Sequence, residues 1–371
     1  MQGEPSMKRR QFLTSAGIGL GAAASGVAMP AIAQSNPEIR WRMTSGFPKS
    51  LDTLFGVSES FSRRIAEATE GRWQIQPFAA GEIVGTFQAF DAIANGTVEM
   101  GHTSAYYYLG KDPTFAAITS LPFGPNARQL TAWQYQGGGN ELCNEYLHRF
   151  NVHASPAGNT GAQMGGWFRR EIRSVPDLQG LKFRVAGIGG IALQRLGVTP
   201  QLLPGGGIYT ALTSGEVDAA EWVGPYDDEK LGLNRAAQFY YYPGWWEWAP
   251  SFDLMVNLRA WERLPDHYKA VLEAAGAEGW HWMMQRYDAQ NPPAARRLIA
   301  SGTQLRVFPQ EVMRACYNAC QDLYAELGER NARFKQIHEG WDRFRRETQA
   351  WFGIAEDSLS NFLVTESQQR R

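Results

Sequence analysis

The sequence predicts an α/β fold built from two similar lobes, and three observations predict it. The chain has 371 residues, which is long enough for two domains with their own cores. Strand-like and helix-like segments alternate along its first third, which is typical of a largely parallel sheet covered by helices. A helix-to-strand unit near residue 95 recurs near residue 215, and this repeat indicates a second lobe of the same kind.

The first lobe is predicted from the segment that begins at residue 39. Ile39–Thr44 alternates polar and apolar residues, as a strand does, and Leu54–Ala68 has the apolar spacing of a helix. Gly71 follows as a helix stop, because glycine readily adopts the left-handed conformation of a helix end. The order continues with a strand over Trp73–Phe78, a helix over Phe87–Ala94 and a strand over Val98–Thr103.

The repeat relates Ala92–Gly101 to Ala211–Ala220. In both segments a helix ends on a polar residue and glycine, and a strand with valine and an acid is expected two residues later. Ligands of open α/β sheets gather at the carboxyl ends of strands. We therefore expect Val217–Trp222 to form one wall of a cleft and His102–Tyr108 to form the facing wall.

The chain is expected to pass between the lobes over residues 156–166 and again over residues 244–252, where glycine is frequent. The domain prediction assigns residues 34–163 with about 250–290 to lobe I, residues 164–249 with about 291–308 to lobe II, and residues 309–371 to C-terminal helices.

One long helix is predicted over Asp266–Gln290. Gly276 and Gly279 are expected to interrupt it, and it is expected to end before Pro292 and Pro293, because proline has no N–H to donate inside a helix.

Two amphipathic helices follow over Gln310–Leu327 and Asn331–Phe352. The second has an aromatic face that must be covered. It packs either on its own lobe or on a second subunit, which would form a symmetric homodimer.

Residues 1–33 are predicted to be a cleaved export signal. Lys8-Arg9-Arg10 precedes an apolar run rich in glycine and alanine, and small residues end it at Ala33. The paired arginines resemble a twin-arginine signal, which directs a protein to the periplasm. A membrane anchor is the alternative, but glycine and serine dilute the apolar run. Met7 is a more natural start than Met1.

Composition excludes some functions. The formal net charge is −1, so no basic field would attract nucleic acid, and we exclude that partner. Cys316 and Cys320 lie four residues apart on a predicted helix, where a disulfide would be strained, so they are expected to be buried thiols. Cys143 has no evident partner, and His102 is expected to be a hydrogen-bonded structural histidine.

The motifs of common enzyme classes are absent from the sequence. There is no Gly-x-Ser-x-Gly elbow, no His-Glu-x-x-His and no phosphate loop with Gly-Lys-Ser/Thr. The glycine runs at 137–139 and 205–207 lack the lysine that a phosphate loop needs. No catalytic constellation is indicated, and we do not expect an enzyme.

Binding groups are present instead. Arg184 ends a predicted strand, and its planar guanidinium suits either a ligand carboxylate or a structural salt bridge. Arg169 is a weaker candidate, and Gln163 lies in the glycine-rich crossover. Glu221 and Trp222 stand at a strand end. The Glu221 carboxylate there is a catalytic acid, a metal ligand or an ordinary polar group of a loop. The lack of catalytic partners disfavours the first of these.

Three segments together resemble the solute receptors of TRAP (tripartite ATP-independent periplasmic) transporters, most closely the branch that binds 2-oxoacids and related monocarboxylates. The segments are residues 159–169, 175–185 and 211–222, and the resemblance also includes residues 106–108 and 243–247. It implies a two-lobed, type II-like periplasmic binding protein with a long helix along both lobes. It also implies a membrane transporter as partner.

The resemblance also implies roles for particular residues. Arg184 would pair with the ligand carboxylate, and Na⁺ or Ca²⁺ would bridge receptor and ligand. The cation ligands would be Gln163, Glu221, the Trp222 carbonyl and, as a further candidate, Glu247. All of these donors are oxygen atoms, which suits a hard cation. Tyr107 or Tyr108 would hydrogen-bond the far end of the ligand. We further expect the ligand to contact Gln163, Trp222, Glu247 and Arg169.

Trp248 departs from the branch, which often has a smaller residue there, and this bears on pocket size. Asp218, Asp227 and Asp228 are expected to be ordinary acids. An alternative for Glu221 is a simple pair with Arg184.

The sequence thus predicts an exported receptor for a small carboxylate, such as pyruvate or lactate, which it delivers to a TRAP transporter. One alternative is a periplasmic metal-dependent enzyme that acts on an oxoacid. Another is a receptor for a different transporter or for a signalling partner.

Overall fold

The computed structural model describes residues 36–369. Every helix and strand of the described residues belongs to one compact unit, which begins at Glu38. The predicted signal over residues 1–33 lies outside the described residues. In the described part of the chain, no helix combines the length and apolar character needed to cross a membrane.

The first sheet has five strands in the order β2-β1-β3-β10-β4. β1, β2 and β3 are parallel, as predicted, whereas β10 runs antiparallel to β3 and β4 because the chain enters it on its return from the second sheet. The strands are β1 (Ile39–Ser45), β2 (Trp73–Phe78), β3 (Met100–Thr103), β4 (Val152–Asn159) and β10 (Ser251–Asn257). The accompanying helices are α1 (Gly56–Ala68), η1 (Thr86–Gln88), α2 (Ala89–Ala94), η2 (Ala105–Tyr108), α3 (Thr114–Thr119), α4 (Ala127–Gln136), α5 (Gly139–Leu147), η3 (His148–Phe150) and α10 (Leu258–Glu262).

The second sheet has six strands in the order β11-β9-β5-β8-β6-β7, and β5 runs antiparallel to both of its neighbours. The strands are β5 (Trp167–Phe168), β6 (Lys182–Arg184), β7 (Thr199–Gln201), β8 (Ala219–Ala220), β9 (Phe239–Tyr242) and β11 (Gln304–Val307). The helices are η4 (Val175–Leu178), α6 (Gly187–Gln194), η5 (Gly205–Gly207), α7 (Ile208–Ser214), α8 (Pro225–Leu231) and α9 (Leu233–Ala236). The exact lobe boundaries stay a prediction.

The predicted repeat is present in the structure. Gly96 and Gly215 both have φ of +78°, and each follows a helix. Val98 N donates to Ala92 O at 3.2 Å and Val217 N donates to Ala211 O at 3.1 Å, so the two turns have the same hydrogen bond. The strands begin at Met100 and Ala219, later than predicted, because the valine and acid still belong to the turn.

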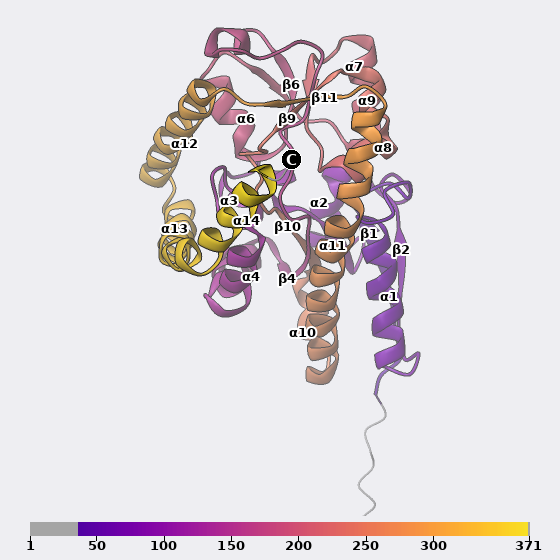
Figure 1. Cartoon of the computed structure of the whole chain (residues 1–371). Coiled ribbons are helices and arrows are strands. Elements are labelled where there is room, and N and C mark those ends of the chain that lie inside the picture. Colours follow the sequence, from indigo (N-terminus) through magenta and orange to yellow (C-terminus); the bar gives the residue numbers. More distant parts are fainter. Residues whose placement is uncertain (1–35, 370–371) are drawn as a thin grey trace, which may run out of the picture. The chain divides into compact units, whose positions relative to one another are not determined.

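The long helix α11 (Asp266–Ala300) continues through Pro292 and Pro293, so its predicted end was wrong. The residues beyond the prolines hold it in place: Ala294 and Leu298 are buried, and Arg297 forms an ion pair with Glu229 of α8. Figure 1 shows α11 in orange, running from beside α8 to beside β4 and α1.

The glycines of α11 do not interrupt it. A Cβ at Gly279 would lie 2.0 Å from Phe61 Cε1, and one at Gly276 would lie 2.9 Å from the Pro156 carbonyl. Glycine therefore serves close packing of α11 on α1 and β4.

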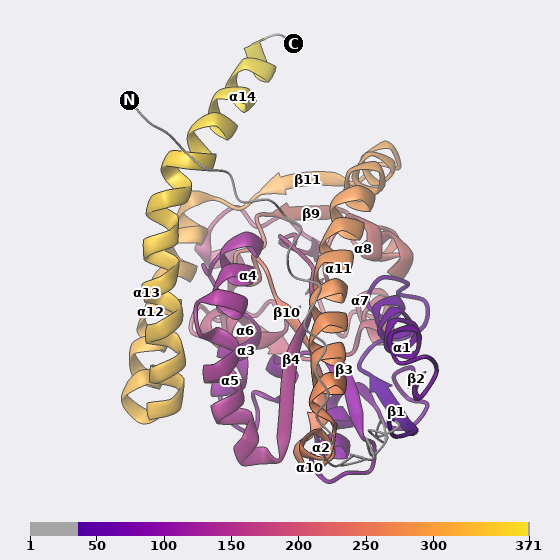
Figure 2. The same cartoon turned by 90° about the horizontal axis from the view of Figure 1, so that it is seen from below.

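The C-terminal helices are α12 (Gln310–Arg330), α13 (Ala332–Phe352) and α14 (Ser358–Gln369), with the π-helical turn η6 (Gly353–Asp357) between the last two. The predicted aromatic face of α13 is partly covered within the chain, since Phe334, Ile337 and Trp341 are buried. Figure 2 shows α14 in yellow, extending away from the two sheets.

The core at β3 corrects one expectation. His102 is buried against Phe47, Phe61 and Phe252, and neither ring nitrogen has a hydrogen-bond partner among the described residues. Burial lowers the pKa of His102 to about 3, so the neutral ring packs as an aromatic group. The three cysteines are buried and free, as predicted.

Candidate ligand-binding site

The backbone between β4 and β5 brings three segments together. Met164 N donates to the Val223 carbonyl at 3.0 Å, and Gln163 N donates to the Glu247 carbonyl at 3.3 Å. Gly244 N donates to the Gln163 carbonyl at 3.2 Å, and a Cβ at Gly244 would lie 2.5 Å from that oxygen. Glycine is therefore needed for the approach that sets Gln163 beside Glu247 and beside the segment after Glu221.

Arg184 stands at the end of β6 and is 1% exposed, as is Glu221. Its Nε donates to the Leu203 carbonyl at 3.0 Å, and its Nη1 donates to the Glu221 carbonyl at 2.8 Å and to Glu221 Oε1. The guanidinium also lies 5.0 Å from the centre of the Trp222 ring. Arg184 Nη2 has no hydrogen-bond partner among the described residues, so one donor group of the fork remains available.

Glu221 is fixed by two donors. Besides Arg184, the Ala186 N–H at the start of α6 donates to Glu221 Oε1 at 2.8 Å. Burial raises the pKa of Glu221, and Arg184 and the Ala186 N–H act against that rise. The pairing with Arg184 that the sequence left as an alternative is thus present in the structure, and it leaves part of both side chains free for another group.

Glu247 follows β9 and is 2% exposed. Neither of its carboxylate oxygens has a hydrogen-bond partner of good geometry among the described residues, although the Gln163 side chain lies close enough to lower the Glu247 pKa. Burial raises the pKa of Glu247 well above its usual range, and the negative charge of Glu221 raises it further, whereas Arg184 opposes the shift. The cluster therefore holds two carboxyl groups and one guanidinium. When both acids are ionised, its net charge is −1.

The 3₁₀ turn η2, which follows β3 of the first sheet, contributes Tyr106 and Tyr107. Their rings lie 4.7 Å apart, and the charge of Arg184 acts on the hydroxyl of each. Burial raises the pKa of Tyr107 to about 12, against the opposing effect of Arg184. Sequence reasoning missed Tyr106, because nothing in the three consecutive tyrosines indicated a 3₁₀ turn, in which neighbouring side chains point about 120° apart.

Two predicted residues lie elsewhere. The hydroxyl of Tyr108 accepts from Phe90 N at 3.2 Å and lies 3.1 Å from Thr103 Oγ1, within the first sheet's own packing. Arg169 is exposed and lines a separate surface pocket of about 310 Å³ with Asn234, Arg235 and Thr303. The structure does not bring either residue to Arg184.

Trp248 lies at the protein surface. It is 42% exposed and lines an apolar pocket of about 320 Å³ with Phe123, Trp245 and Met313. Gln163 forms part of the wall of that pocket. Trp248 therefore shapes this neighbouring pocket.

The prediction that Asp227 and Asp228 are ordinary acids was wrong. Both are buried, and α8 carries them into the protein interior. Asp227 accepts from the Tyr287 hydroxyl at 2.7 Å, whereas Asp228 accepts from Tyr240 at 2.7 Å and from Trp167 Nε1 at 2.9 Å. Burial raises the pKa of Asp227 to about 7 and that of Asp228 to about 6. These bonds fix α8 against α11 and the second sheet.

Unpartnered polar atoms thus converge between the two sheets. They are Arg184 Nη2, Gln163 Oε1, Trp222 Nε1 and both carboxylate oxygens of Glu247. Buried polar groups normally have partners, so this concentration indicates a site for a polar ligand. In the part of the chain that the structure describes, no group of three or more His, Cys, Asp or Glu could hold a metal ion. A cation here would need the amide and main-chain oxygens as well.

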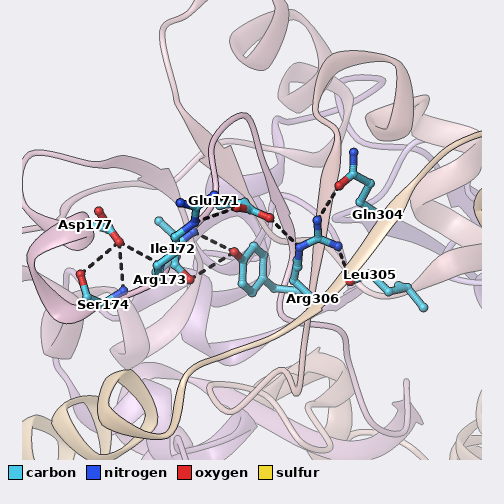
Figure 3. A network of polar contacts seen from close by, with 9 residues as sticks. Glu171, Ile172, Arg173, Ser174, Asp177, Gln304, Leu305 and Arg306 are labelled. Atoms are coloured by element: carbon cyan, nitrogen blue, oxygen red, sulfur yellow. Dashed lines mark hydrogen bonds and ion pairs between the residues drawn. The ribbon is translucent and has the colours of Figure 1, made fainter.

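A second polar network lies on the second sheet and is shown in Figure 3. Arg306 of β11 donates to Glu171 at 2.7 Å, and the Tyr241 hydroxyl accepts from Ile172 N at 2.7 Å. Asp177 accepts from Arg173 N at 2.8 Å and caps η4. These contacts tie β11, β9 and the loop after β5 together, and their groups are partnered.

Comparisons with known proteins identify the kind of fold. Residues 45–331 match the family described as bacterial extracellular solute-binding protein, family 7 (DctP). A protein of Nostoc sp. strain PCC 7120, named a monocarboxylate 2-oxoacid-binding periplasmic protein, is 51% identical over an alignment of 364 residues that covers 96% of this chain and 99% of that one.

Two crystal structures are similar as well. A TRAP transporter solute-binding protein from Bordetella bronchiseptica RB50 is 47% identical, with a TM-score of 0.89 over 91% of this chain and 100% of that one. It is a mixed-occupancy dimer with copurified calcium and picolinate in one active site and an apo second site. A TRAP periplasmic solute-binding protein from Pseudoalteromonas atlantica T6c has bound sodium and pyruvate. It is 34% identical, with a TM-score of 0.85 over 87% of this chain and 99% of that one.

Proposed function

This chain belongs to the family 7 bacterial extracellular solute-binding proteins, and on that basis we propose that it is a periplasmic receptor for a small 2-oxoacid or hydroxy acid such as pyruvate or lactate. It delivers the acid to the membrane subunits of a TRAP transporter. The family is one of solute receptors and not of enzymes. The bound pyruvate of the Pseudoalteromonas protein supports the ligand class.

The observation that carries the proposal is the set of buried, unpartnered polar atoms around Arg184. Arg184 Nη2 faces no partner among the described residues, although Nε and Nη1 are both used. A ligand carboxylate would satisfy it, because guanidinium and carboxylate form strong charge-assisted hydrogen bonds. Tyr107, together with Tyr106, closes the site from the first sheet and is assigned to the far end of the ligand.

The same cluster fits a hard cation. Gln163 Oε1 and the Glu247 carboxylate have no partners, and Glu221 lies close enough to raise the pKa of Glu247. We assign the cation to these three side chains and the Trp222 carbonyl, since all are oxygen donors suited to Na⁺ or Ca²⁺. The ion would supply the positive charge that lets a carboxylate ligand approach two acids. Sodium and calcium in the two similar structures support this assignment.

A homodimer through the C-terminal helices is part of the proposal. The exposed apolar side chains of η6 and α14 support it, and the Bordetella protein is a dimer. The exposed residues are Ile354, Leu359, Phe362, Leu363 and Val364.

Titration calorimetry tests the proposed function. Purified protein should bind pyruvate in Na⁺ or Ca²⁺ buffer and bind it much more weakly after chelation in choline chloride. Arg184→Ala should weaken binding by about 2–5 kcal/mol, because a charge pair would lose one partner. Arg169→Ala is the matched control and should bind like the wild type, because Arg169 is exposed and distant from the cluster. Binding of pyruvate that is independent of both the cation and Arg184 would contradict the proposal.

A further inference from the structure

Asp52 joins parts of the chain that belong to different sheets. It lies between β1 of the first sheet and α1, whereas its partners Tyr226 and Lys230 lie on α8, which follows β8 of the second sheet. The Tyr226 hydroxyl donates to Asp52 Oδ2 at 3.0 Å, and Lys230 forms an ion pair with Asp52 Oδ1. α1 and α8 lie on the same side of α11 in both views (Figures 1 and 2).

α11 completes the cluster. Arg286 Nη2 donates to Asp52 Oδ2 at 2.7 Å, and Arg286 Nε donates to the buried Thr53 Oγ1 at 3.2 Å. Both carboxylate oxygens of Asp52 are therefore used, one by Lys230 and the other by Tyr226 and Arg286. Burial tends to raise the pKa of Asp52, but the hydrogen bonds from these three residues outweigh it and lower the pKa.

α8 is attached firmly to the ligand site. It begins at Pro225, three residues after Trp222, and the Asp228 carboxylate accepts from Val223 N at 3.3 Å. Asp228 also holds Tyr240 and Trp167 of the second sheet. A force on α8 is therefore transmitted to the segment that carries Glu221 and Trp222.

α8 is held on α11 independently of Asp52. Tyr226 N donates to Asn291 Oδ1 at 3.0 Å, and Arg297 pairs with Glu229. The Asp52 contacts thus add a link to the first sheet that these other bonds do not provide.

We propose that Asp52 is a positioning residue for ligand retention, whose contacts with Tyr226 and Lys230 hold the two walls of the ligand site together while the acid is bound. This inference rests on the proposed function. In this proposal Asp52 does not itself contact the ligand. Loss of the link lets the Glu221–Trp222 wall separate from the Tyr106–Tyr107 wall more often, so the ligand leaves faster while its rate of entry is unchanged.

Stopped-flow tryptophan fluorescence with pyruvate at constant Na⁺ tests the proposal. Asp52→Asn should raise the dissociation rate about three- to ten-fold, the range expected for a partly exposed charge pair with additional hydrogen bonds. Lys230→Met should have a similar effect, and the double variant should release pyruvate no faster than Asp52→Asn alone. Raising ionic strength with choline chloride should accelerate release from the wild type more than from Asp52→Asn.

Glu82→Gln is the matched control. Glu82 pairs with Lys49 at 2.5 Å and is about as exposed as Asp52, but Glu82 and Lys49 both follow strands of the first sheet. Its dissociation rate should equal that of the wild type. The melting temperature of ligand-free Asp52→Asn should fall no further than that of Glu82→Gln, since a purely structural role would lower stability without changing release.

Wild-type release rates in both Asp52→Asn and Lys230→Met would overturn the inference and leave the proposed function intact. Absence of pyruvate binding by the wild type would instead contradict the proposed function. If Asp52→Asn does not fold, Lys230→Met carries the test alone, and an unchanged rate in that variant overturns the inference.

Discussion

Asp253 shows how strongly burial shifts the pKa of a single carboxyl group in this fold. Its carboxyl lies in β10 opposite Thr103 and Pro156, and Oδ2 has no hydrogen-bond partner among the described residues. Burial alone raises its pKa to about 8 from a reference value of 3.8. The native state therefore retains a proton that the unfolded chain loses near pH 4.

The sign of the resulting pH dependence follows from this shift. Between pH 4 and 8 the native state binds more protons at Asp253 than the unfolded state does, so its stability falls as the pH rises. Asp253→Asn should resemble the protonated acid and lose less stability between pH 4.5 and 8. Urea unfolding at the two pH values measures the difference, with the exposed Asp322→Asn as control. Equal pH dependence of Asp253→Asn and the wild type would contradict the shift.

Asp227 and Asp228 show that the burial of a side chain could not be predicted from its local sequence. Their neighbours in sequence, Gly224 and Pro225, are typical of a surface turn, and the sequence predicted ordinary acids there. Their burial depends on Tyr287 and Trp167, which lie 60 and 61 residues away along the chain. Arg184, Glu221 and Gln163 were predicted to lie together, because the repeat and the family resemblance supplied the long-range information that local pattern lacks.

At the scale of elements, α11 is the clearest difference between expectation and structure. Its start at Asp266 was predicted correctly. Its end was not, because contacts that carry the helix past Pro292 come from α8, which lies far from this segment in the sequence. Local helix signals reflect backbone preference. In this helix, tertiary packing determines that the chain stays helical at both the prolines and the glycines.

The glycines of α11 give a test of that packing. Gly279→Ala should destabilise the protein by about 1–3 kcal/mol, because the added methyl group would collide with Phe61, and this loss exceeds the roughly 1 kcal/mol that alanine gains in a helix. Gly328→Ala in α12 is the matched control: its Cβ would come no closer than 3.8 Å to Lys335, so it should stabilise the protein. Urea unfolding measures both changes, and the same sign for the two variants would contradict the packing argument.

At the scale of the whole molecule, η6 and α14 expose a group of large apolar side chains. Ile354, Leu359 and Phe362 are 74%, 60% and 58% exposed, although large apolar patches on a monomer usually mark an interaction surface. A second copy of this chain is the proposed partner, and the dimeric Bordetella protein supports that choice. Association through one helix from each copy would bury the same face twice, which is the arrangement of a symmetric dimer.

Light scattering after size-exclusion chromatography tests this association. The wild type should have the mass of a dimer, and Phe362→Glu should shift it toward the monomer, because a charge within the contact is costly to desolvate. Ile299→Glu on α11 is the control, since Ile299 is 49% exposed but lies outside η6 and α14, and its mass should equal that of the wild type. If Phe362→Glu and the wild type have the same mass, α14 does not form the contact. Pyruvate affinity measured on the monomeric variant separates dimer formation from ligand binding. We expect the affinity to be unchanged, because Arg184, Glu221 and Glu247 interact with one another and with groups outside α14.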